Sequence, residues 1–200
     1  MPKAFSESER RNIKRRLMEE AKLCLTQFGV KKTTVDELVK RVNIPKGTFY
    51  LFYESKELLF FDVFCEFHDE IQKNLMSEIA SVNGAFDAKG LTGLIFKYYK
   101  AVEESFLLKL ITNGDLELLM RKLPEDVVKA HTEKDDFNIE NLISILPGIK
   151  LTNIKAISGS LRGIFLSMLH KHEIGDDIFY EALKIMLYGV IIQMFEGESI

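Results

Sequence analysis

Residues 46–50 read Lys-Gly-Thr-Phe-Tyr and bring together four residue types suited to contact with a polyanion. The Lys46 ammonium can pair with a phosphate or with the acceptor atoms of guanine. Gly47 has no side chain, so a nucleic-acid backbone can approach closely. The Thr48 hydroxyl can donate to phosphate or its methyl can contact thymine, and the Tyr50 phenol can reach a phosphate oxygen. The segment therefore predicts a contact with duplex DNA.

Other candidates for the same contact lie on either side of this segment. Thr34 and Lys56 each stand at the start of a predicted helix, where free amides and the helix dipole favour an anion. Lys31 and Lys32 come just before Thr34. Singly, Thr34 could be only a cap and each lysine only a solvated charge. As a set within 26 residues they favour binding to a DNA backbone, which should weaken steeply with salt.

The elements that must position these residues are two short helices joined by a tight turn. Thr34 with Glu37 is a capping-box pattern that begins the first helix. Asn43 tolerates the left-handed backbone that a tight turn needs, and Pro45 suits the first turn of the second helix. Phe49 and Phe52 are expected to face a core. Two such helices, braced by a preceding helix, match a helix-turn-helix, which inserts its second helix into the major groove.

The charge of the chain is distributed unevenly in a way that agrees with this reading. Residues 1–56 contain 13 Lys and Arg against 7 Asp and Glu, a net +6. The remaining residues contain 14 against 23, a net −9. A basic segment of fewer than sixty residues on an acidic body predicts that the basic part meets a polyanion.

The hydrophobic pattern is helical nearly throughout, and we expect an all-α fold of about nine helices. A first helix should run from a capping box at Ser6 and Glu9 to Gly29, with Phe28 on its apolar face. We expect functional domains at 1–55, a helix-turn-helix domain, and 56–200, a larger helical domain. Later helices are expected at about 56–79, 91–112 and 115–122, and another should begin near Pro124. A further helix should run from Thr152 or Asn153 to about His172, and the last helix should end at about Phe195.

The stretch from Thr33 to Leu59 resembles the N-terminal domain of the TetR family of transcriptional regulators. Over about residues 8–60 the family's pattern is matched by Thr34, Lys46, Gly47, Thr48, Phe49, Tyr50, Phe52 and Lys56. The resemblance implies that Thr34, Lys46, Thr48, Tyr50 and Lys56 contact DNA, chiefly its backbone. It also implies a helical effector-binding and dimerisation domain, and a ligand-released repressor, in which a small-molecule effector lowers operator affinity.

Three positions depart from the family's pattern. Asn43 replaces the usual glycine of the turn, Pro45 stands where a serine cap is common, and Leu51 replaces a polar residue. The first should keep the geometry at a small cost in free energy. The second removes a capping hydroxyl, and the third removes a base or phosphate contact.

The last two predicted helices carry more apolar surface than one chain needs, which predicts a homodimer through them. Gly159, Ser160, Gly163 and Ser167 would allow close helix approach. Burial within a single chain is the alternative. A two-fold dimer presents two reading helices and therefore a near-palindromic operator.

Aromatic residues cluster in the body and are candidates for a pocket that binds an apolar or aromatic effector. These are Phe64, Phe67, His68, Tyr98, Tyr99, Phe106, Met120 and Phe137. Ordinary core packing is the alternative for each of them.

No catalytic pattern, phosphate-binding glycine loop or metal motif is apparent, so we expect no enzyme activity, cofactor or metal. Cys65 and His68 have a spacing that could begin a metal site, but zinc needs three or four ligands. Cys65 and Cys24 are both better interpreted as buried thiols in a reducing cytoplasm. The absence of a long apolar run predicts no membrane span. A structural, chromosome-associated DNA-binding protein without a small ligand is the second hypothesis, and an enzyme or metal-binding helical bundle is the third.

Overall fold

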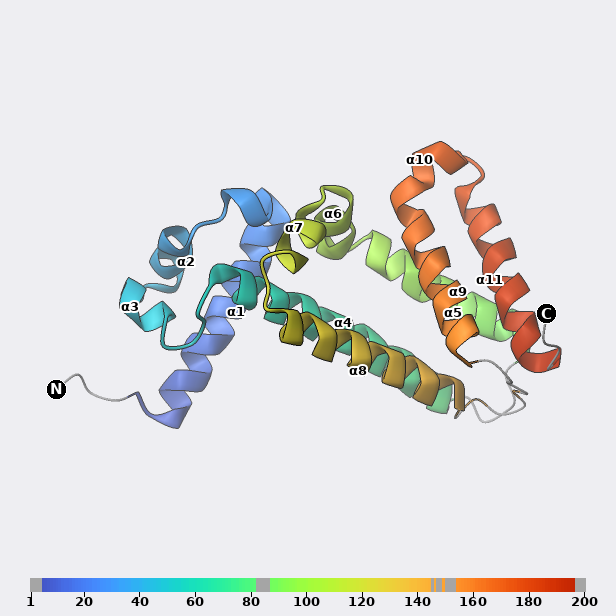
Figure 1. The fold of residues 1–200 in the computed structure, drawn as a ribbon, viewed down its shortest axis with the longest axis horizontal. Helices are drawn as coiled ribbons and strands as arrows, with labels where there is room; N and C mark the ends of the chain where they lie inside the picture. The colour runs from blue at the N-terminus through green and yellow to red at the C-terminus, as the bar shows by residue number, and fades with distance from the viewer. Residues whose placement is uncertain (1–4, 82–86, 145, 147–148, 150–153, 197–200) are drawn as a thin grey trace. The chain divides into compact units, whose positions relative to one another are not determined.

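The computed structural model describes residues 5–81, 87–144, 146, 149 and 154–196, excluding the side chains of residues 132, 135–140 and 142–144. Every regular element within these ranges is helical (Figure 1), which confirms the predicted all-α fold. The elements are α1 (Glu7–Lys32), α2 (Val35–Val42), α3 (Lys46–Phe49), α4 (Lys56–Ser81), α5 (Ala88–Glu103), α6 (Phe106–Thr112), α7 (Asp115–Met120), α8 (Glu125–Ser144), α9 (Ile154–Leu166), the 3₁₀ helix η1 (Ser167–His170), α10 (Lys171–Ile174) and α11 (Phe179–Glu196).

The chain forms two compact units that are interleaved in sequence. Unit 1 consists of Met1–His68 and Phe106–Val128, and unit 2 of Asp69–Ser105 and Lys129–Ile200. The predicted functional boundary between residues 55 and 56 stays a prediction.

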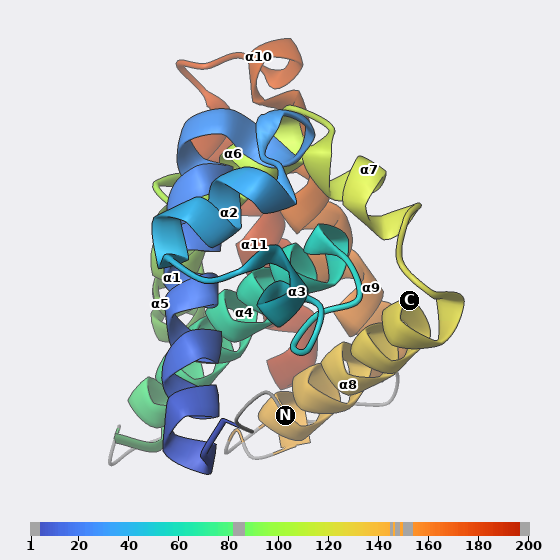
Figure 2. The same cartoon turned by 90° about the vertical axis from the view of Figure 1, so that its left-hand side faces the viewer.

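Unit 1 is built around the apolar face of α1, against which α2, α6 and α7 pack. In Figure 2, α2 and α3 lie toward the viewer beside α1. The spacing of apolar residues along α1 fits one helical face, and the partner helices contribute aliphatic and aromatic side chains. The buried residues of these elements include Leu17, Ala21, Cys24, Leu25, Leu38, Val39, Val42, Phe49, Leu107 and Leu110.

The predicted start of α1 is confirmed, whereas its end differs from the prediction. The Glu9 amide donates to the Ser6 hydroxyl, and the Ser6 amide donates to the Glu9 carboxylate at 2.8 Å. Gly29 leaves the helical backbone with φ +74°, but one more turn follows to Lys32. Phe28, which continues the apolar spacing of this helix, is 44% exposed, and the Arg41 guanidinium lies 5.6 Å from its ring centre. A cation over the ring can cover one face while leaving the other in water.

Unit 2 contains a helical hairpin in which α9 and α11 pack together and α10 lies at the turn (Figure 1). The buried face of α11 repeats every three or four residues through Leu183, Leu187, Ile191 and Met194. The same helix packs along α5. Because one stripe of α11 supplies this core, its other side is left for solvent or for a partner.

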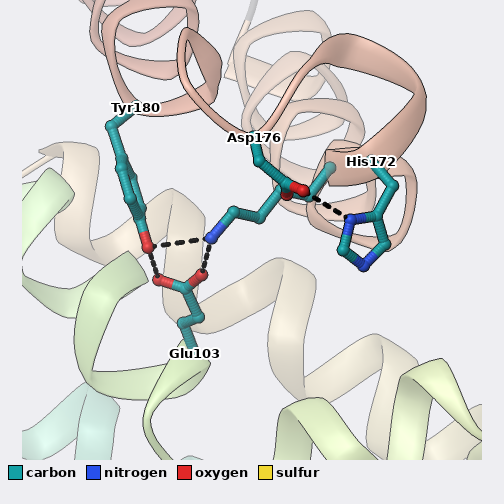
Figure 3. A network of polar contacts seen from close by, with 5 residues as sticks. Glu103, His172, Asp176 and Tyr180 are labelled. Carbon is teal, nitrogen blue, oxygen red and sulfur yellow. Dashed lines mark hydrogen bonds and ion pairs between the residues drawn. The ribbon is translucent and has the colours of Figure 1, made fainter.

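A polar network joins the end of α5 to the turn of this hairpin (Figure 3). The Lys171 ammonium donates to a Glu103 carboxylate oxygen at 2.8 Å, and the Tyr180 hydroxyl donates to the other oxygen. Burial disfavours the charged form of Glu103, but the bonds from Lys171 and Tyr180 outweigh it, so the pKa of this carboxyl is lowered. On the same turn, His172 Nδ1 lies 2.8 Å from the Asp176 carboxylate, and both side chains are exposed.

Two predicted helices are divided in the structure. The helix expected at about 91–112 breaks after Glu103, where the Ser105 hydroxyl donates to the Val102 carbonyl, and α6 begins at Phe106. The helix expected to reach His172 ends as α9 at Leu166 and continues as η1 and α10. Its predicted start at Thr152 or Asn153 lies outside the described residues.

Candidate nucleic-acid interface

Local sequence sets the geometry of α2, the turn and α3. The Thr34 hydroxyl accepts from the Glu37 amide at 3.2 Å and so caps α2. Asn43 ends α2 in the left-handed conformation, with φ +56° and ψ +54°, as its position in the turn predicted. Pro45 then has an extended backbone and precedes α3, which is a single turn of four residues. A three-residue connection therefore separates two short helices, the geometry of a helix-turn-helix.

Burial of one aromatic ring fixes which way α3 presents its other side chains. Phe49 is fully buried and anchors α3 on the core, whereas the neighbouring Tyr50 is 51% exposed. Their rings meet edge to face, with centres 5.3 Å apart. Lys46 and Gly47 are exposed as well. The helix thus turns a lysine, a glycine and a phenol outward, as expected for a helix that enters a groove.

Most of the predicted DNA contacts are exposed, but Thr48 is buried and Lys56 is partly buried. Lys31, Lys32 and Thr34 are exposed beside the start of α2. Thr48 is buried, with 8% of its surface exposed, which was not foreseen for a residue expected to touch phosphate or thymine. A hydroxyl in that position has little access to a groove, although its role as a contact stays a prediction.

Lys56 is partly buried and already bonded to protein atoms. Its ammonium donates to the Val30 carbonyl at 2.8 Å and to the Thr33 carbonyl at 2.6 Å. Burial lowers the pKa of this ammonium. The side chain therefore connects the start of α4 to the segment between α1 and α2. A contact with DNA would use the same ammonium, and this role of Lys56 stays a prediction.

The structure brings four predicted contacts to one open depression of about 370 Å³. The depression is lined by Thr34, Val35, Asp36, Lys46, Tyr50, Glu54, Ser55, Lys56 and Glu57. Four residues from three helices or their caps, Thr34, Lys46, Tyr50 and Lys56, therefore share a surface. Gly47, Thr48, Lys31 and Lys32 are not in its lining.

Sequence reasoning missed the acidic residues of this depression. Asp36 pairs with Lys46, whose ammonium lies 3.0 Å from the carboxylate, and this bond raises the pKa of Lys46. Glu57 pairs with Lys122 at 3.0 Å. The position of Asp36 in the first turn of α2 is a general sign of dipole compensation, but nothing in the sequence signals its pairing with a lysine ten residues later.

The predicted effector-site residues are divided between the two units. In unit 1 the Phe67 and Phe106 rings meet edge to face with centres 5.2 Å apart, and Phe64 stacks on His68 at 6.1 Å. Met120 lies at the end of α7. These contacts are compatible with core packing as well as with a pocket lining, so the predicted ligand role stays a prediction.

In unit 2 the two predicted tyrosines make hydrogen bonds to protein groups. The Tyr99 hydroxyl donates to the Leu161 carbonyl at 2.7 Å, and burial raises the pKa of this phenol. The Tyr98 hydroxyl donates to the Glu78 carboxylate at 3.2 Å. The side chain of Phe137 lies outside the described residues. An open groove of about 600 Å³ between α5 and α11 is lined by Lys89, Thr92, Gly93, Phe96, Lys184, Ile185, Tyr188 and Gly189, none of which was predicted.

The described ranges also bear on metal binding and on membrane insertion. There, no group of three or more His, Cys, Asp or Glu residues is arranged to hold a metal ion. Within the same ranges, none of the helices has the length and apolar character needed to span a bilayer. Cys24 is buried and Cys65 partly buried, neither of them in a disulfide within the described residues, and burial raises the pKa of Cys24.

Comparisons with known proteins agree with this geometry. Residues 17–63 match the sequence model of the tetR family of bacterial regulatory proteins. An HTH-type transcriptional regulator of Bacillus subtilis, YhgD, is 40% identical over 60 residues, which cover 30% of this chain and 31% of that relative's length. The chain therefore aligns with less than a third of that relative.

Solved structures extend the likeness in fold to nearly the whole chain. A protein of Mesorhizobium loti assigned to the TetR family is similar with a TM-score of 0.64 and 16% identity, over 96% of this chain and 98% of that one. FadR of Thermus thermophilus, a TetR-family repressor solved with lauroyl-CoA, is similar with a TM-score of 0.62 and 17% identity, over 94% of this chain and 95% of that one. Residues 17–63 therefore carry the sequence pattern of the tetR family across the helix-turn-helix, and the fold of the chain is similar to that of TetR-family proteins.

Proposed function

We propose that this protein is a sequence-specific regulator of transcription that binds duplex DNA as a homodimer and is released from it by a small molecule. The observation that carries the proposal is the convergence of Thr34, Lys46 and Tyr50 on one open surface of the helix-turn-helix. A cation, a phenol and a helix N-terminus together suit a phosphate backbone. Such a regulator would act on the chromosome in the cytoplasm.

In this proposal α3 enters the major groove and its first turn makes the contacts. The anchoring of Phe49 in the core holds α3 in place, so that Lys46 and Tyr50 meet DNA without a costly rearrangement. Lys46 must exchange its bond to Asp36 for one to DNA. Because both partners of that pair are more than half exposed, the exchange costs little free energy.

The proposed homodimer uses the outer surfaces of α9 and α11. Large apolar residues remain exposed there or at the turn between them: Leu166 (49%), Ile178 (50%), Ile185 (66%) and Tyr188 (38%). Gly159 and Gly163 lie one turn apart on α9, and open space surrounds the position where a Cβ would stand on each. A second copy could cover this surface with close helix contact, and the pair would then read a near-palindromic operator.

For the effector we propose an apolar or aromatic compound, and the ligand of a similar fold suggests where to begin. FadR of Thermus thermophilus was solved with lauroyl-CoA. Acyl-CoA thioesters and planar aromatics therefore form a rational first screen. A coupling free energy of about 1–3 kcal/mol between the effector and DNA would suffice to release an operator.

The DNA proposal is tested by selecting duplexes from a random pool with the full chain and measuring affinity by fluorescence anisotropy. Lys46→Ala and Tyr50→Ala should each weaken binding at least about fivefold, since a contact is worth about 1 kcal/mol or more. Lys46→Ala should also lower the slope of log affinity against log salt by about 1. Lys109→Ala, an exposed lysine on α6, is the matched control.

Melting curves of all variants separate lost contacts from lost folding. If both variants bind like the parent, α3 is not the reading helix. If the parent selects no duplex at low salt, the DNA-binding proposal itself fails, and a helical protein with another partner must be considered.

The homodimer is tested separately by sedimentation. Ile185→Asp places a charge on the proposed interface and should yield monomers at concentrations where the parent is dimeric. Lys109→Asp introduces the same carboxylate on unit 1 and should leave the dimer intact. A dimer that tolerates Ile185→Asp would place the interface elsewhere.

A further inference from the structure

A buried carboxylate in unit 1 lies against the break in α1. Asp115, the first residue of α7, is 7% exposed, and its Oδ2 accepts from the Val30 amide at 3.1 Å. Val30 itself is 1% exposed. The two residues are 85 positions apart in sequence. A buried amide without a partner is costly, so Asp115 stabilises the backbone at the point where α1 stops being regular.

The conformation of Gly29 makes this contact possible. Its φ of +74° and ψ of −179° belong to a region that only glycine adopts readily. A Cβ added there would overlap the Asp115 carboxylate. The absence of a side chain at residue 29 therefore serves both the backbone turn and the close approach of α7.

The short segment after the break is held from a second direction by α4. Lys56 donates to the carbonyls of Val30 and Thr33. The Thr33 hydroxyl donates to the Gly29 carbonyl at 2.9 Å. Backbone groups of Gly29, Val30 and Thr33 thus have hydrogen-bond partners from α4, from α7 and from within the segment. The next residue, Thr34, is the cap of α2 and a proposed DNA contact.

The chain connectivity of α6 and α7 suggests why this arrangement matters. Residues 106–128 of unit 1 are preceded by Ser105 and followed by Lys129, both of which belong to unit 2. A conformational change in unit 2 can therefore act on both ends of this segment through the covalent chain. Within unit 1, α6 and α7 pack on α1, and Asp115 is the point where α7 bonds to its backbone.

We propose that Asp115 is a positioning residue for DNA recognition: its carboxylate fixes residues 29–33, and through them the N-terminus of α2, so that a displacement of α7 lowers operator affinity. This inference rests on the proposed function and adds to it a specific residue and contact. Asp115 does not touch DNA in this scheme. It acts through Val30 and the connection to Thr34.

The test uses the full chain and three variants. Asp115→Ala removes the acceptor, Asp115→Asn keeps an oxygen that can accept from Val30, and Thr33→Val removes only the hydroxyl bond to Gly29. Glu117→Ala removes a carboxylate from the exposed side of the same helix and is the matched control, because Glu117 pairs there with Arg121.

The first readout is hydrogen–deuterium exchange of peptides covering residues 29–34, without DNA. We expect exchange there to be about tenfold faster or more in Asp115→Ala, smaller changes in Asp115→Asn and Thr33→Val, and none in Glu117→Ala. The second readout is affinity for a duplex selected by the parent, measured well below the melting temperature of each variant. Asp115→Ala should bind about tenfold more weakly, and Asp115→Asn should recover most of the loss.

The outcomes separate this inference from the proposed function. Unchanged exchange and unchanged affinity in folded Asp115→Ala would overturn the inference, as would a lowered melting temperature with parental affinity, because that pattern indicates a purely structural role. If Asp115→Ala does not fold, Thr33→Val is the deciding variant. We expect it to show faster local exchange and a two- to threefold weaker affinity for DNA, which corresponds to about 0.5 kcal/mol. Parental exchange and parental affinity in Thr33→Val would contradict the inference. If the parent binds no duplex, the proposed function fails, and local exchange alone shows whether Asp115 holds the connection.

Discussion

The Lys171–Glu103–Tyr180 network in unit 2 allows a quantitative prediction about stability. Lys171→Met keeps most of the alkyl chain and removes the ammonium. The Glu103 carboxylate, 15% exposed, would keep the Tyr180 hydroxyl but lose its charged partner. A hydrogen bond to a charged group contributes about 1.5–3 kcal/mol, and partial exposure of Lys171 places the loss near the lower end, at about 2 kcal/mol. For a chain of this size the melting temperature should fall by about 4–8 °C.

The pH dependence of this loss has a definite sign. The pKa of Glu103 is lowered in the folded protein from its ordinary value of 4.5. A carboxyl with a lowered folded-state pKa contributes stability above its unfolded-state pKa, and this contribution is lost as the pH falls through the folded value. The difference between the parent and Lys171→Met should therefore be largest near neutral pH and should shrink below about pH 4.5.

Urea unfolding followed by circular dichroism at several pH values measures both effects. Lys155→Met, which removes an exposed lysine of α9, is the control and should change the free energy of unfolding by less than about 0.5 kcal/mol. The double variant with Glu103→Gln should be less destabilised than the sum of the two single variants. A Lys171→Met penalty that is absent, or that is the same at pH 4 and pH 7, would refute the assignment of this network as an ionised pair.

Three further predictions concern the helix-turn-helix and its helix caps. Asp36→Asn should strengthen DNA binding about threefold in anisotropy titrations, since it frees Lys46 and removes a negative charge facing phosphate; unchanged or weaker binding would contradict this. Asn43→Ala should lower the free energy of unfolding by about 1–2 kcal/mol, because alanine resists a φ of +56°, and an unchanged urea midpoint would show that the turn relaxes. Ser6→Ala should cost about 1 kcal/mol by loss of the capping box, and calorimetry would reveal a smaller value if the first turn frays.

Local rules predicted much of unit 1 correctly. Ser6 with Glu9, Thr34 and Asn43 each act within a few residues, so their hydrogen bonds and backbone angles follow from sequence patterns. The break between α5 and α6 was missed because the local sequence pattern gives no sign of it. Apolar residues such as Val102 and Phe106 keep helical spacing across it, and no glycine or proline interrupts them.

The candidate DNA surface was predictable in its outward residues and less so in its interactions. Lys46 and Tyr50 stand out from their residue types and their place after the turn, and they are exposed. The burial of Thr48 and the pairing of Asp36 depend on how α2 and α3 pack together. The bond from Val30 to Asp115 spans 85 residues and has no local signal, so only a three-dimensional structure could find it.

The interleaving of the two units has a consequence for protein engineering. A chimera that grafts residues 1–55 onto a foreign ligand-sensing body would leave behind α6 and α7, along with Asp115 and the leucines that cover α1. Such a graft would expose the apolar side chains of α1 that α6 and α7 cover, and it would leave the Val30 amide without its acceptor. A transplant that keeps residues 106–128 together with 1–68 would carry these partners of α1 along with it.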